Sequence, residues 1–223
     1  MLAFVREEIA DDAALLLSRL HQPRSAYIAG RNRAPYQLIF VNLSGGAHKG
    51  PDHLRLNPNG LIPVLVQDDL VLYESAAICL HLVDTHPGCK LAPAIGTGER
   101  AHFYKWLMWS SSTLQPALSM YLHPHKWAND PAIFPELRAC AEQKVYGLFD
   151  LLDGALESHG GQWLLGDTYS AVDACALTLC RWSRGMPRPG TSWPHVGPYM
   201  NRILARPAVQ RALQQEHLQE PWI

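Results

Sequence analysis

A hairpin-like segment between residues 62 and 74 constrains the fold of this chain more than any other sequence feature. Two runs of strand-forming residues, 62–67 and 70–74, flank Asp68-Asp69, and two polar residues between such runs predict a tight β-hairpin. Pro63 lies near the start of the first run, where a proline is tolerated because the strand is only beginning. The segment therefore predicts a sheet in the first half of the chain.

Further elements are expected around this hairpin. Residues 36–43 predict a strand, and residues 51–56 predict a short helix that the turn sequence Asn57-Pro58-Asn59-Gly60 ends. Ser75 is expected to cap a second helix. The apolar stripe of that helix consists of Ala76, Cys79, Leu80 and Val83. The order strand, short helix, hairpin, helix indicates an α/β domain with a mixed sheet.

The chain changes character near residue 90. Residues 87–98 are rich in Pro, Gly and Ala and are expected to form a linker. Beyond it, apolar side chains recur at helical spacing in three long segments, and shorter helices are expected over residues 199–204 and 208–215. The three apolar faces are Phe103, Trp106, Leu107, Ser110 and Leu114; Val145, Leu148, Phe149, Leu152 and Leu156; and Val172, Cys175, Leu179 and Trp182. The second half is therefore predicted to be all-helical.

The charges and cysteines exclude several classes of function. Lys and Arg number 19 against 20 Asp and Glu, so the chain lacks the net positive charge of a nucleic-acid or anionic-membrane binder. The first residues do not resemble a signal peptide, and no apolar run approaches the ~20 residues that span a bilayer. The five cysteines form no Cys-x-x-Cys pair, and their odd number argues against a disulfide framework. We expect a cytoplasmic protein with no nucleic-acid or membrane partner.

The residues around the hairpin fit a peptide ligand that has an amino-acid end. A cis bond between Ile62 and Pro63 is expected, with the backbone N–H and C=O of Ile62 turned outward to pair with an extended peptide. Glu74 and Ser75 lie at the next junction of strand and helix. Ser75 and the free N–H groups of the helix start can hold a carboxylate, while Glu74 can accept from an ammonium group.

Three spaced motifs make the sequence similar to the soluble, bacterial-type glutathione transferases. They are Asn-Pro-x-Gly-x-Ile-Pro at residues 57–63, Glu-Ser-x-Ala-Ile at residues 74–78 and Gly-Asp-x-x-Ser-x-x-Asp at residues 166–173. The resemblance implies a thioredoxin-like α/β domain over residues 1–86, a linker over residues 87–98 and an all-α domain over residues 99–223. It also implies a homodimer.

The same resemblance implies where glutathione, the expected co-substrate, would bind. The residues carried over are Ile62 and Pro63 for the cysteinyl group, Glu74 and Ser75 for the γ-glutamyl end, and His48 and Lys49 for the glycyl carboxylate. The motifs fix the first four positions, whereas the last two rest on a loop that precedes the short helix.

The sequence leaves open which residue would activate the glutathione thiol. The family places a hydroxyl or thiol after the first strand, where it hydrogen-bonds the sulfur and favours the thiolate over a thiol of pKa ~8.5. If residues 2–5 form that strand and residues 7–20 the first helix, the junction Val5-Arg6-Glu7-Glu8 offers no hydroxyl. If His21-Gln-Pro-Arg-Ser25-Ala-Tyr27 is the strand exit instead, Ser25 or Tyr27 would contact the sulfur.

The second half supplies an expected substrate pocket and an expected structural cap. A mixed aromatic and hydroxyl face on one long helix could bind an apolar electrophile, and its residues are Trp109, Ser110, Thr113, Tyr121 and His123. Ser170 and Asp173 are expected to form a capping box, with Asp in the N3 place usually held by Glu. The His-x-His pair at residues 123–125 has no cysteine or carboxylate close by in the sequence, so no metal site is expected.

These observations predict a glutathione transferase-like protein that uses the glutathione thiol on a small hydrophobic electrophile, by conjugation, addition or isomerisation. Holding the thiolate beside the substrate would supply much of the rate. The alternative is a non-catalytic binding protein of the same fold that lacks the thiol-activating residue. The two hypotheses differ in what precedes Pro35, where the expected hydroxyl is hardest to place.

Overall fold

The computed structural model describes residues 39–215, 218, 220, 222 and 223, and the chain divides into two compact units. The first unit comprises residues 1–94 and 205–219, and the second comprises residues 95–204 and 220–223. The expected first strand and first helix lie outside the described residues, as do Ser25 and Tyr27. No helix in the described part of the chain is both long and apolar enough to cross a membrane.

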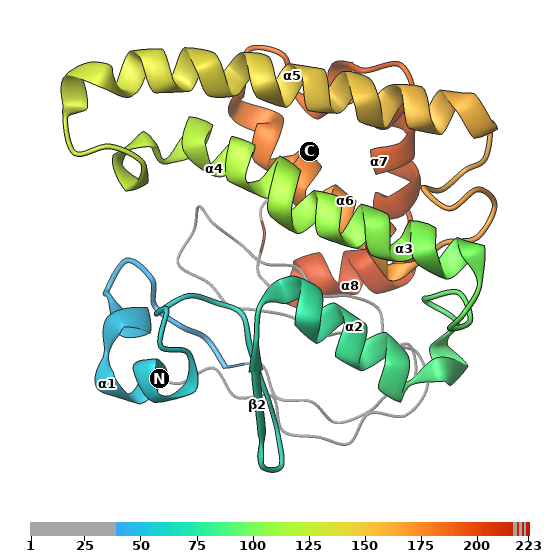
Figure 1. Ribbon diagram of the computed structural model, residues 1–223, viewed down its shortest axis with the longest axis horizontal. Helices are drawn as coiled ribbons and strands as arrows, with labels where there is room; N and C mark the ends of the chain where they lie inside the picture. The colour runs from blue at the N-terminus through green and yellow to red at the C-terminus, as the bar shows by residue number, and fades with distance from the viewer. Residues whose placement is uncertain (1–38, 216–217, 219, 221) are drawn as a thin grey trace. The chain divides into compact units, whose positions relative to one another are not determined.

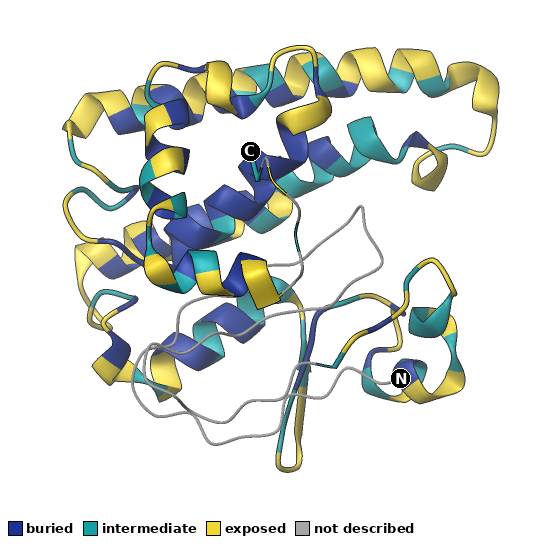
Figure 2. Ribbon diagram, turned by 180° about the vertical axis from the view of Figure 1, so that it is seen from behind, coloured by how far each residue is buried: buried dark blue, intermediate teal, exposed yellow. Residues whose placement is uncertain are grey.

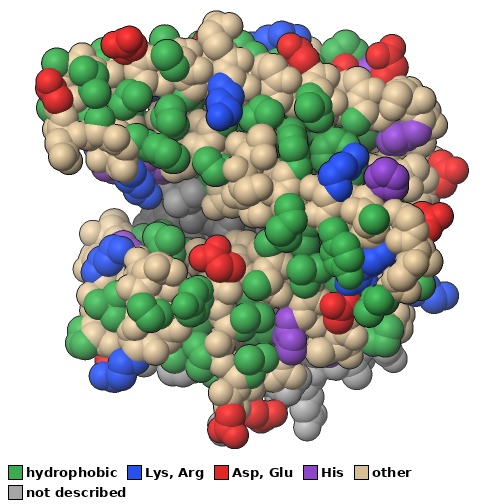
Figure 3. Space-filling view, in the orientation of Figure 1, with side chains coloured by type: hydrophobic (Ala, Val, Ile, Leu, Met, Phe, Trp, Pro, Cys, Tyr) green, Lys and Arg blue, Asp and Glu red, His purple; other side chains and the backbone are tan. Residues whose placement is uncertain are grey.

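The first unit contains a β-hairpin flanked by helices. Its elements are α1 (Pro51–Leu56), β1 (Val64–Gln67), β2 (Leu70–Tyr73), α2 (Ser75–Thr85) and α8 (Pro207–Gln215). β1 and β2 are antiparallel, and Gln67 pairs with Leu70, so Asp68 and Asp69 alone form the turn. Asp68 has a φ of 49°, a left-handed angle that tight hairpin turns require. The hairpin prediction is therefore confirmed, and its acidic tip lies at the bottom of Figure 3.

The strand expected over residues 36–43 is not confirmed by the described residues. Residues 39–42 belong to no strand, and the chain turns over residues 43–46 before a short 3-10 helix at Ala47–Lys49. A strand is defined by its ladder partner, and within the described part of the chain β1 pairs only with β2. The described sheet is accordingly a two-stranded antiparallel sheet rather than a mixed one.

The start of α2 also differs from the expectation. Glu74 is the N-cap residue, Ser75 is the first helical residue, and no side chain makes a capping hydrogen bond there. The prediction that Ser75 caps this helix is therefore wrong, because the chain enters the helix one residue earlier than the Ser pattern suggests. The buried face of α2 is Ile78, Cys79, Leu82 and Val83. Of the expected stripe, Cys79 and Val83 are therefore buried, whereas Ala76 and Leu80 are only half-buried.

The second unit is all-helical. Its helices are α3 (Gly98–Trp109), α4 (Gln115–Leu122), α5 (Phe134–His159), α6 (Ala171–Trp182) and α7 (Val196–Leu204). A π-helical turn at Ser110–Leu114 joins α3 to α4, so the one long helix expected here is a continuous rod with a wider turn in its middle. In Figure 1, α5 (yellow) runs alongside this rod (green). α6 packs against both parts of the rod and against α7.

The core of the helical unit follows the three apolar faces that the sequence predicts. Phe103, Leu114, Phe149 and Val172 have no exposed surface, whereas Leu148 and Cys175 are only half-buried. Figure 2 shows the consequence for α5, which is buried along one side and exposed along the other. Burying a large apolar side chain stabilises a fold by roughly 1.5–3 kcal/mol, so these faces dictate how the helices pack.

Local sequence sets where several of these helices begin and end. The Thr97 hydroxyl accepts from the Arg100 N–H at 3.2 Å and caps α3. α5 ends at Gly160, whose φ of 61° is a left-handed angle that glycine adopts at little cost. Ser170 and Asp173 form the capping box of α6 that their spacing predicts, with the Ser170 N–H donating to the Asp173 carboxylate at 2.7 Å.

Asp173 also ties three segments of the helical unit together. Its buried carboxylate accepts from the Leu164 N–H at 2.9 Å and from the Tyr199 hydroxyl at 2.9 Å, in addition to Ser170. The Ser170 hydroxyl also donates to it at 3.1 Å. Burial raises the pKa of the Asp173 carboxyl, and these four hydrogen bonds only partly offset that effect. The residue therefore links the loop before α6, the start of α6 and α7 through one side chain.

Candidate functional site

The register of the β1–β2 hairpin brings two of the predicted binding segments to one place. Val64 pairs with Tyr73 at the open end of the hairpin. The residues that precede Val64 therefore lie beside those that follow Tyr73, since paired strands stay ≈ 5 Å apart. The Ile62–Pro63 bond, which is cis as the sequence analysis expects, and the Glu74-Ser75 pair share this end of the unit.

The loop that presents Ile62 is held in place by two buried polar side chains. His53 and Asn57 are each 2% exposed. The His53 Nε2–H and the Asn57 amide both donate to the carbonyl of Leu61, each at 2.8 Å. The Asn57 side-chain oxygen also accepts from the Asn59 N–H at 3.1 Å. Because the carbonyl before Ile62 is fixed from two sides, the backbone of Ile62 is held in a defined orientation, and it has no hydrogen-bond partner among the described residues.

The loop with His48 and Lys49 packs against the same turn. Both residues belong to the 3-10 helix at Ala47–Lys49, and the Lys49 Nζ donates to the carbonyl of Asn59 at 3.0 Å. Gly60 has a φ of 60°, a left-handed angle that favours glycine, and a Cβ at this position would lie 2.8 Å from the Lys49 side chain. Lys49 is exposed and His48 is half-buried. The structure thus places the cationic loop beside the turn that leads to Ile62.

Glu74 holds a strained backbone conformation at this end of the hairpin. Its φ is 74° and its ψ is 114°, a region that residues with a Cβ rarely adopt. Such strain costs of order 1–3 kcal/mol and is concentrated at functional sites. The exposed Glu74 carboxylate has no hydrogen-bond or ion-pair partner in the described part of the chain, so it is open to an external cation.

Ser75 lies next to unpaired backbone donors. It is the first residue of α2, and the first intrahelical bond is donated by the Ile78 N–H to the carbonyl of Glu74. The N–H groups of Ser75, Ala76 and Ala77 therefore start the helix without intrahelical partners. The half-buried Ser75 hydroxyl likewise has no partner among the described residues. Together these donors can hold an anionic group such as a carboxylate.

The predicted substrate-pocket residues fall into two groups along the rod of the helical unit. Trp109 ends α3, and Ser110 and Thr113 lie in the π-helical turn that follows. Tyr121 is near the end of α4 and His123 comes just after it. At 1.5 Å per residue, Tyr121 lies roughly 18 Å along the rod from Trp109, so one small ligand does not reach both groups.

Ser110 is the most unusual member of the first group. It is only 3% exposed, and its buried hydroxyl has no hydrogen-bond partner in the part of the chain that the structure describes. The hydroxyls of Ser111 and Ser112 each donate to carbonyls of the preceding turn, namely Leu107 and Met108. A buried hydroxyl without a partner is unfavourable by roughly 1–3 kcal/mol, so Ser110 has a donor to offer to a ligand.

The second group offers a tyrosine and a histidine. Burial and the negative charge of Glu142 raise the pKa of Tyr121, although Arg138 acts in the opposite direction. The rings of His123 and His125 pack edge to face with centroids 5.6 Å apart. In the described residues no group of three or more His, Cys, Asp or Glu side chains is arranged to hold a metal ion.

Sequence reasoning missed the buried partners that orient the site. The side-chain bond from Asn57 to the Asn59 N–H is an Asx-turn, which the Asn-Pro-Asn-Gly sequence could have indicated. The bond from His53 to Leu61 gave no such signal, because it joins residues eight positions apart across a turn. By contrast, Trp106 and Leu114, which lie near the predicted pocket and belong to a predicted apolar face, are core residues as expected.

Comparison with known families supports this arrangement of two parts. Residues 18–84 match the family model described as "Glutathione S-transferase, N-terminal domain", and residues 111–207 match "Glutathione S-transferase, C-terminal domain". The first match includes every residue of the candidate site in the first unit. It also includes Ser25 and Tyr27 but not the Val5–Glu8 junction.

Similar proteins of known name span most of their own length and most of this chain. Glutathione S-transferase GST-4.5 of Xanthomonas campestris is 31% identical over 186 residues, covering 82% of this chain and 88% of the relative. Glutathione S-transferase 3 of Zea mays is 33% identical, with coverages of 85% and 87%. The disulfide-bond oxidoreductase YfcG of Escherichia coli is also 33% identical, with coverages of 80% and 83%.

Solved structures agree with these relatives. The ternary complex of BphK, a bacterial GST, superposes with a TM-score of 0.67 at 33% identity and covers 76% of this chain and 81% of that protein. A sphingomonad glutathione S-transferase complexed with glutathione gives a TM-score of 0.66 at 30% identity, with coverages of 77% and 81%. These likenesses cover both the hairpin-containing unit and the helical unit in one architecture.

Proposed function

This chain belongs to the glutathione S-transferase family, and we propose from that premise that it binds glutathione and uses its thiolate on a small hydrophobic electrophile, by conjugation, addition or isomerisation. The observation that carries the proposal is the hairpin register that sets Ile62 and Pro63 beside Glu74 and Ser75. The Ile62 backbone, the Glu74 carboxylate and the Ser75 hydroxyl have no partner within the described residues, and with the Lys49 loop they match the two ends and the middle of a tripeptide. The relatives named glutathione S-transferase favour this enzyme function over the non-catalytic alternative.

The binding mode follows from the chemistry of each group. The γ-glutamyl carboxylate accepts from the Ser75 hydroxyl and the N–H groups at the start of α2, and its ammonium donates to Glu74. The backbone of Ile62 pairs with the cysteinyl amide, as in the edge of a sheet. The glycyl carboxylate lies near Lys49 and His48, whose loop Lys49 already ties to the turn before Ile62. Pro63 is buried behind this contact.

Ser25 and Tyr27 remain the two candidates for the group that activates the thiol. Both lie within the matched N-terminal family segment, which supports the alignment in which this part of the chain is the strand exit. A hydroxyl that donates to the sulfur stabilises the thiolate and raises its share at neutral pH. Replacing the right hydroxyl, by Ser25→Ala or Tyr27→Phe, should lower kcat by roughly 10²–10³-fold, as removing one oxyanion donor does.

The decisive test combines glutathione binding with a pH–rate profile. Calorimetry should show one glutathione site per chain, and conjugation to a chlorinated dinitrobenzene should already be near its plateau at pH 7 in the wild type. In the variant that lacks the activating hydroxyl, the rate should instead rise tenfold per pH unit toward the free-thiol pKa of ~8.5. If glutathione does not bind, the proposal is wrong. If it binds but neither variant changes the profile, the protein binds glutathione without activating it.

A second activity is favoured by one specific relative, the Escherichia coli disulfide-bond oxidoreductase that is 33% identical to this chain. With the same bound thiolate, the protein would attack a disulfide, release one thiol and form a mixed disulfide with glutathione, and a second glutathione would release the other thiol. A small dialkyl disulfide as substrate, with oxidised glutathione as the measured product, separates this activity from conjugation.

The apolar substrate, in our proposal, contacts Trp109, Ser110 and Thr113, where an aromatic ring and two hydroxyls stand close together. Tyr121 and His123 would contact only a longer substrate. We also propose a homodimer, for which sedimentation should give about twice the 24.9 kDa of one chain. The cytoplasm is the proposed compartment, because its reducing conditions keep glutathione and the five free cysteines as thiols.

A further inference from the structure

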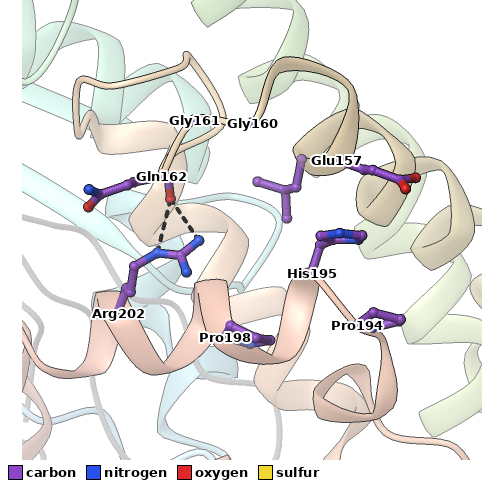
Figure 4. Close-up of a pocket in the computed structure, with 9 residues that line it drawn as sticks. Glu157, Gly160, Gly161, Gln162, Pro194, His195, Pro198 and Arg202 are labelled. Carbon is purple, nitrogen blue, oxygen red and sulfur yellow. Dashed lines mark hydrogen bonds between the residues drawn. The ribbon is translucent and has the colours of Figure 1, made fainter.

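A cavity of about 280 Å³ lies in the helical unit, and none of its lining residues is proposed to bind glutathione (Figure 4). One wall is formed by the end of α5 and the loop after it, and the other by the start and one face of α7. The residues that matter here are Leu156, Glu157, Gln162, His195, Pro198 and Arg202. Two of them, His195 and Arg202, can carry positive charge, and each is fixed by the protein itself.

His195 is fixed by a buried carboxylate. Its Nδ1–H donates to Asp153 Oδ2 at 2.9 Å, and the N–H groups of His195 and Val196 donate to Asp153 Oδ1 at 2.8 and 2.9 Å. Asp153 is 8% exposed, whereas the His195 side chain is 40% exposed. Because Asp153 occupies Nδ1, only Nε2 is left to contact a ligand, and in the imidazolium form it is a donor.

Arg202, at the other end of the cavity, is fixed by a backbone carbonyl. Its Nε and Nη2 donate to the carbonyl of Gln162 at 3.3 and 3.1 Å, as Figure 4 shows. This pair of bonds sets the plane of the guanidinium and leaves Nη1 without a partner among the described residues. Arg202 therefore presents a charged donor whose orientation is decided before any ligand arrives, which lowers the entropy lost on binding.

The two charged residues lie at the two ends of one side of α7. His195 directly precedes the helix, and its carbonyl accepts from the Tyr199 N–H at 3.1 Å as in a helical turn. Pro198 and Arg202 follow at i+3 and i+7, so the three residues lie on one side. The axial distance from His195 to Arg202 is roughly 10 Å, at 1.5 Å per residue. Between them the cavity is lined by Pro198 and, from α5, by the buried Leu156. A ligand that matches this cavity has an anionic group at each end and an apolar middle.

We propose that this cavity is a binding site for a small linear dicarboxylate with a chain of about five or six carbons, one carboxylate on Arg202 and one on His195. Such a molecule, extended between a hydrogen bond at each end, is comparable in length with the axial offset of the two backbone positions. Each carboxylate gains a charge-assisted hydrogen bond. A monocarboxylate of the same length can satisfy only one end. The site is independent of the proposed glutathione chemistry, because it shares no residue with it.

Among the described residues that line the cavity, Glu157 is the one with an acidic side chain. In Figure 4 it extends away from Arg202, on the side of His195. Its carboxylate repels a dicarboxylate, whereas it would attract the ammonium group of an amino acid. Glu157→Gln therefore separates these two ligand classes. The variant should bind the dicarboxylate as well as the wild type or more tightly, and weaker binding would overturn the proposal in favour of an ammonium-bearing ligand.

The test uses glutarate and adipate as probes, with pentanoate and hexanoate as monocarboxylates of the same lengths, titrated into the full chain by calorimetry at pH 6. The diacids should bind saturably and roughly tenfold or more tightly than the monoacids. Arg202→Gln should reduce diacid affinity by about tenfold or more and bring it close to that of the monoacids. Arg211→Gln, an exposed change of the same charge on α8, should leave diacid affinity unchanged.

His195→Gln provides the second arm, because it removes the imidazolium and leaves Arg202 in place. His195→Gln should lower diacid affinity by about tenfold or more and bring it close to that of the monoacids, because one carboxylate loses its charge-assisted partner. No saturable diacid binding, equal binding of monoacids, or loss of affinity in Arg211→Gln equal to that in Arg202→Gln would each overturn the proposal.

Discussion

Val64 pairs with Tyr73 at the open end of the β1–β2 hairpin, and this single pairing aligns the two halves of the candidate glutathione site. The residue before Val64 is Pro63 and the residue after Tyr73 is Glu74, so positions eleven apart in sequence become neighbours. A slip of the register by one residue would exchange the faces of the strand and separate them. The site therefore depends on a turn of only two residues, Asp68 and Asp69.

The first prediction concerns Ser75→Ala. Loss of a hydroxyl that donates to a carboxylate should weaken glutathione binding by about 1.5–3 kcal/mol, measured by calorimetry. The free energy of unfolding should change by less than about 0.5 kcal/mol, because the Ser75 hydroxyl neither caps α2 nor makes a hydrogen bond to any described residue. Ser158→Ala, on the exposed face of α5, is the matched control. Equal affinity in both variants would remove Ser75 from the site.

The second prediction concerns the strained Glu74. Glu74→Gly relieves a φ of 74° and should raise the free energy of unfolding by about 1 kcal/mol, while it removes the carboxylate and weakens glutathione binding. Asp68→Gly is the control, because Asp68 also has a positive φ but lies at the far end of the hairpin. It should gain stability in urea unfolding with no change in affinity. A Glu74→Gly variant that binds normally would contradict the proposed role.

The third prediction concerns the buried network of Asp173. Asp173→Ala should lower the free energy of unfolding by about 3 kcal/mol or more, because it leaves the Leu164 and Ser170 N–H groups and the Tyr199 hydroxyl without an acceptor. Ser170→Ala should lower it by only ~1 kcal/mol, the usual contribution of a cap. Denaturant unfolding of both variants gives the comparison. Similar small losses would show that the carboxylate is replaceable by water.

The fourth prediction concerns pH and Asp153. Burial raises the pKa of its carboxyl, but hydrogen bonds from His195 and from the backbone N–H groups of Val196 and His195 outweigh that effect, so the net pKa is lowered. A lowered pKa stabilises the fold above the ordinary value of 3.8, and that contribution is lost as the pH falls through the folded-state value. Asp153→Asn should therefore be less stable than wild type at pH 7, and the difference should shrink below pH 4. A constant difference would contradict the shift.

Much of the fold could be predicted because its signals are local. The two-residue turn of the hairpin, the bounds of α1 and the capping box at Ser170 and Asp173 each depend on a few neighbouring residues. The apolar faces of α3, α5 and α6 could also be predicted, because each depends on the spacing of apolar residues within one helix. The start of α2 was misread because the strain at Glu74, which decides where the helix begins, has no signature in a single sequence.

The candidate site was predictable only as far as its motifs extend. Ile62, Pro63, Glu74 and Ser75 carry the family pattern, and the hairpin register explains why they must act together. The support from His53 depends on a contact across a turn, and the pair of His195 with Asp153 joins residues 42 positions apart. Contacts of this kind are decided by packing, so no local pattern marks them.

The π-helical turn at Ser110–Leu114 has a consequence for how the length of this chain can vary. A π turn holds one residue more than an α turn, so it shifts the angular phase of α4 relative to α3 by about 100°. A relative that lacks one residue here could keep both helices while turning its serines to another face. When such sequences are aligned with this one, the gap belongs inside the helix and not in the flanking loops.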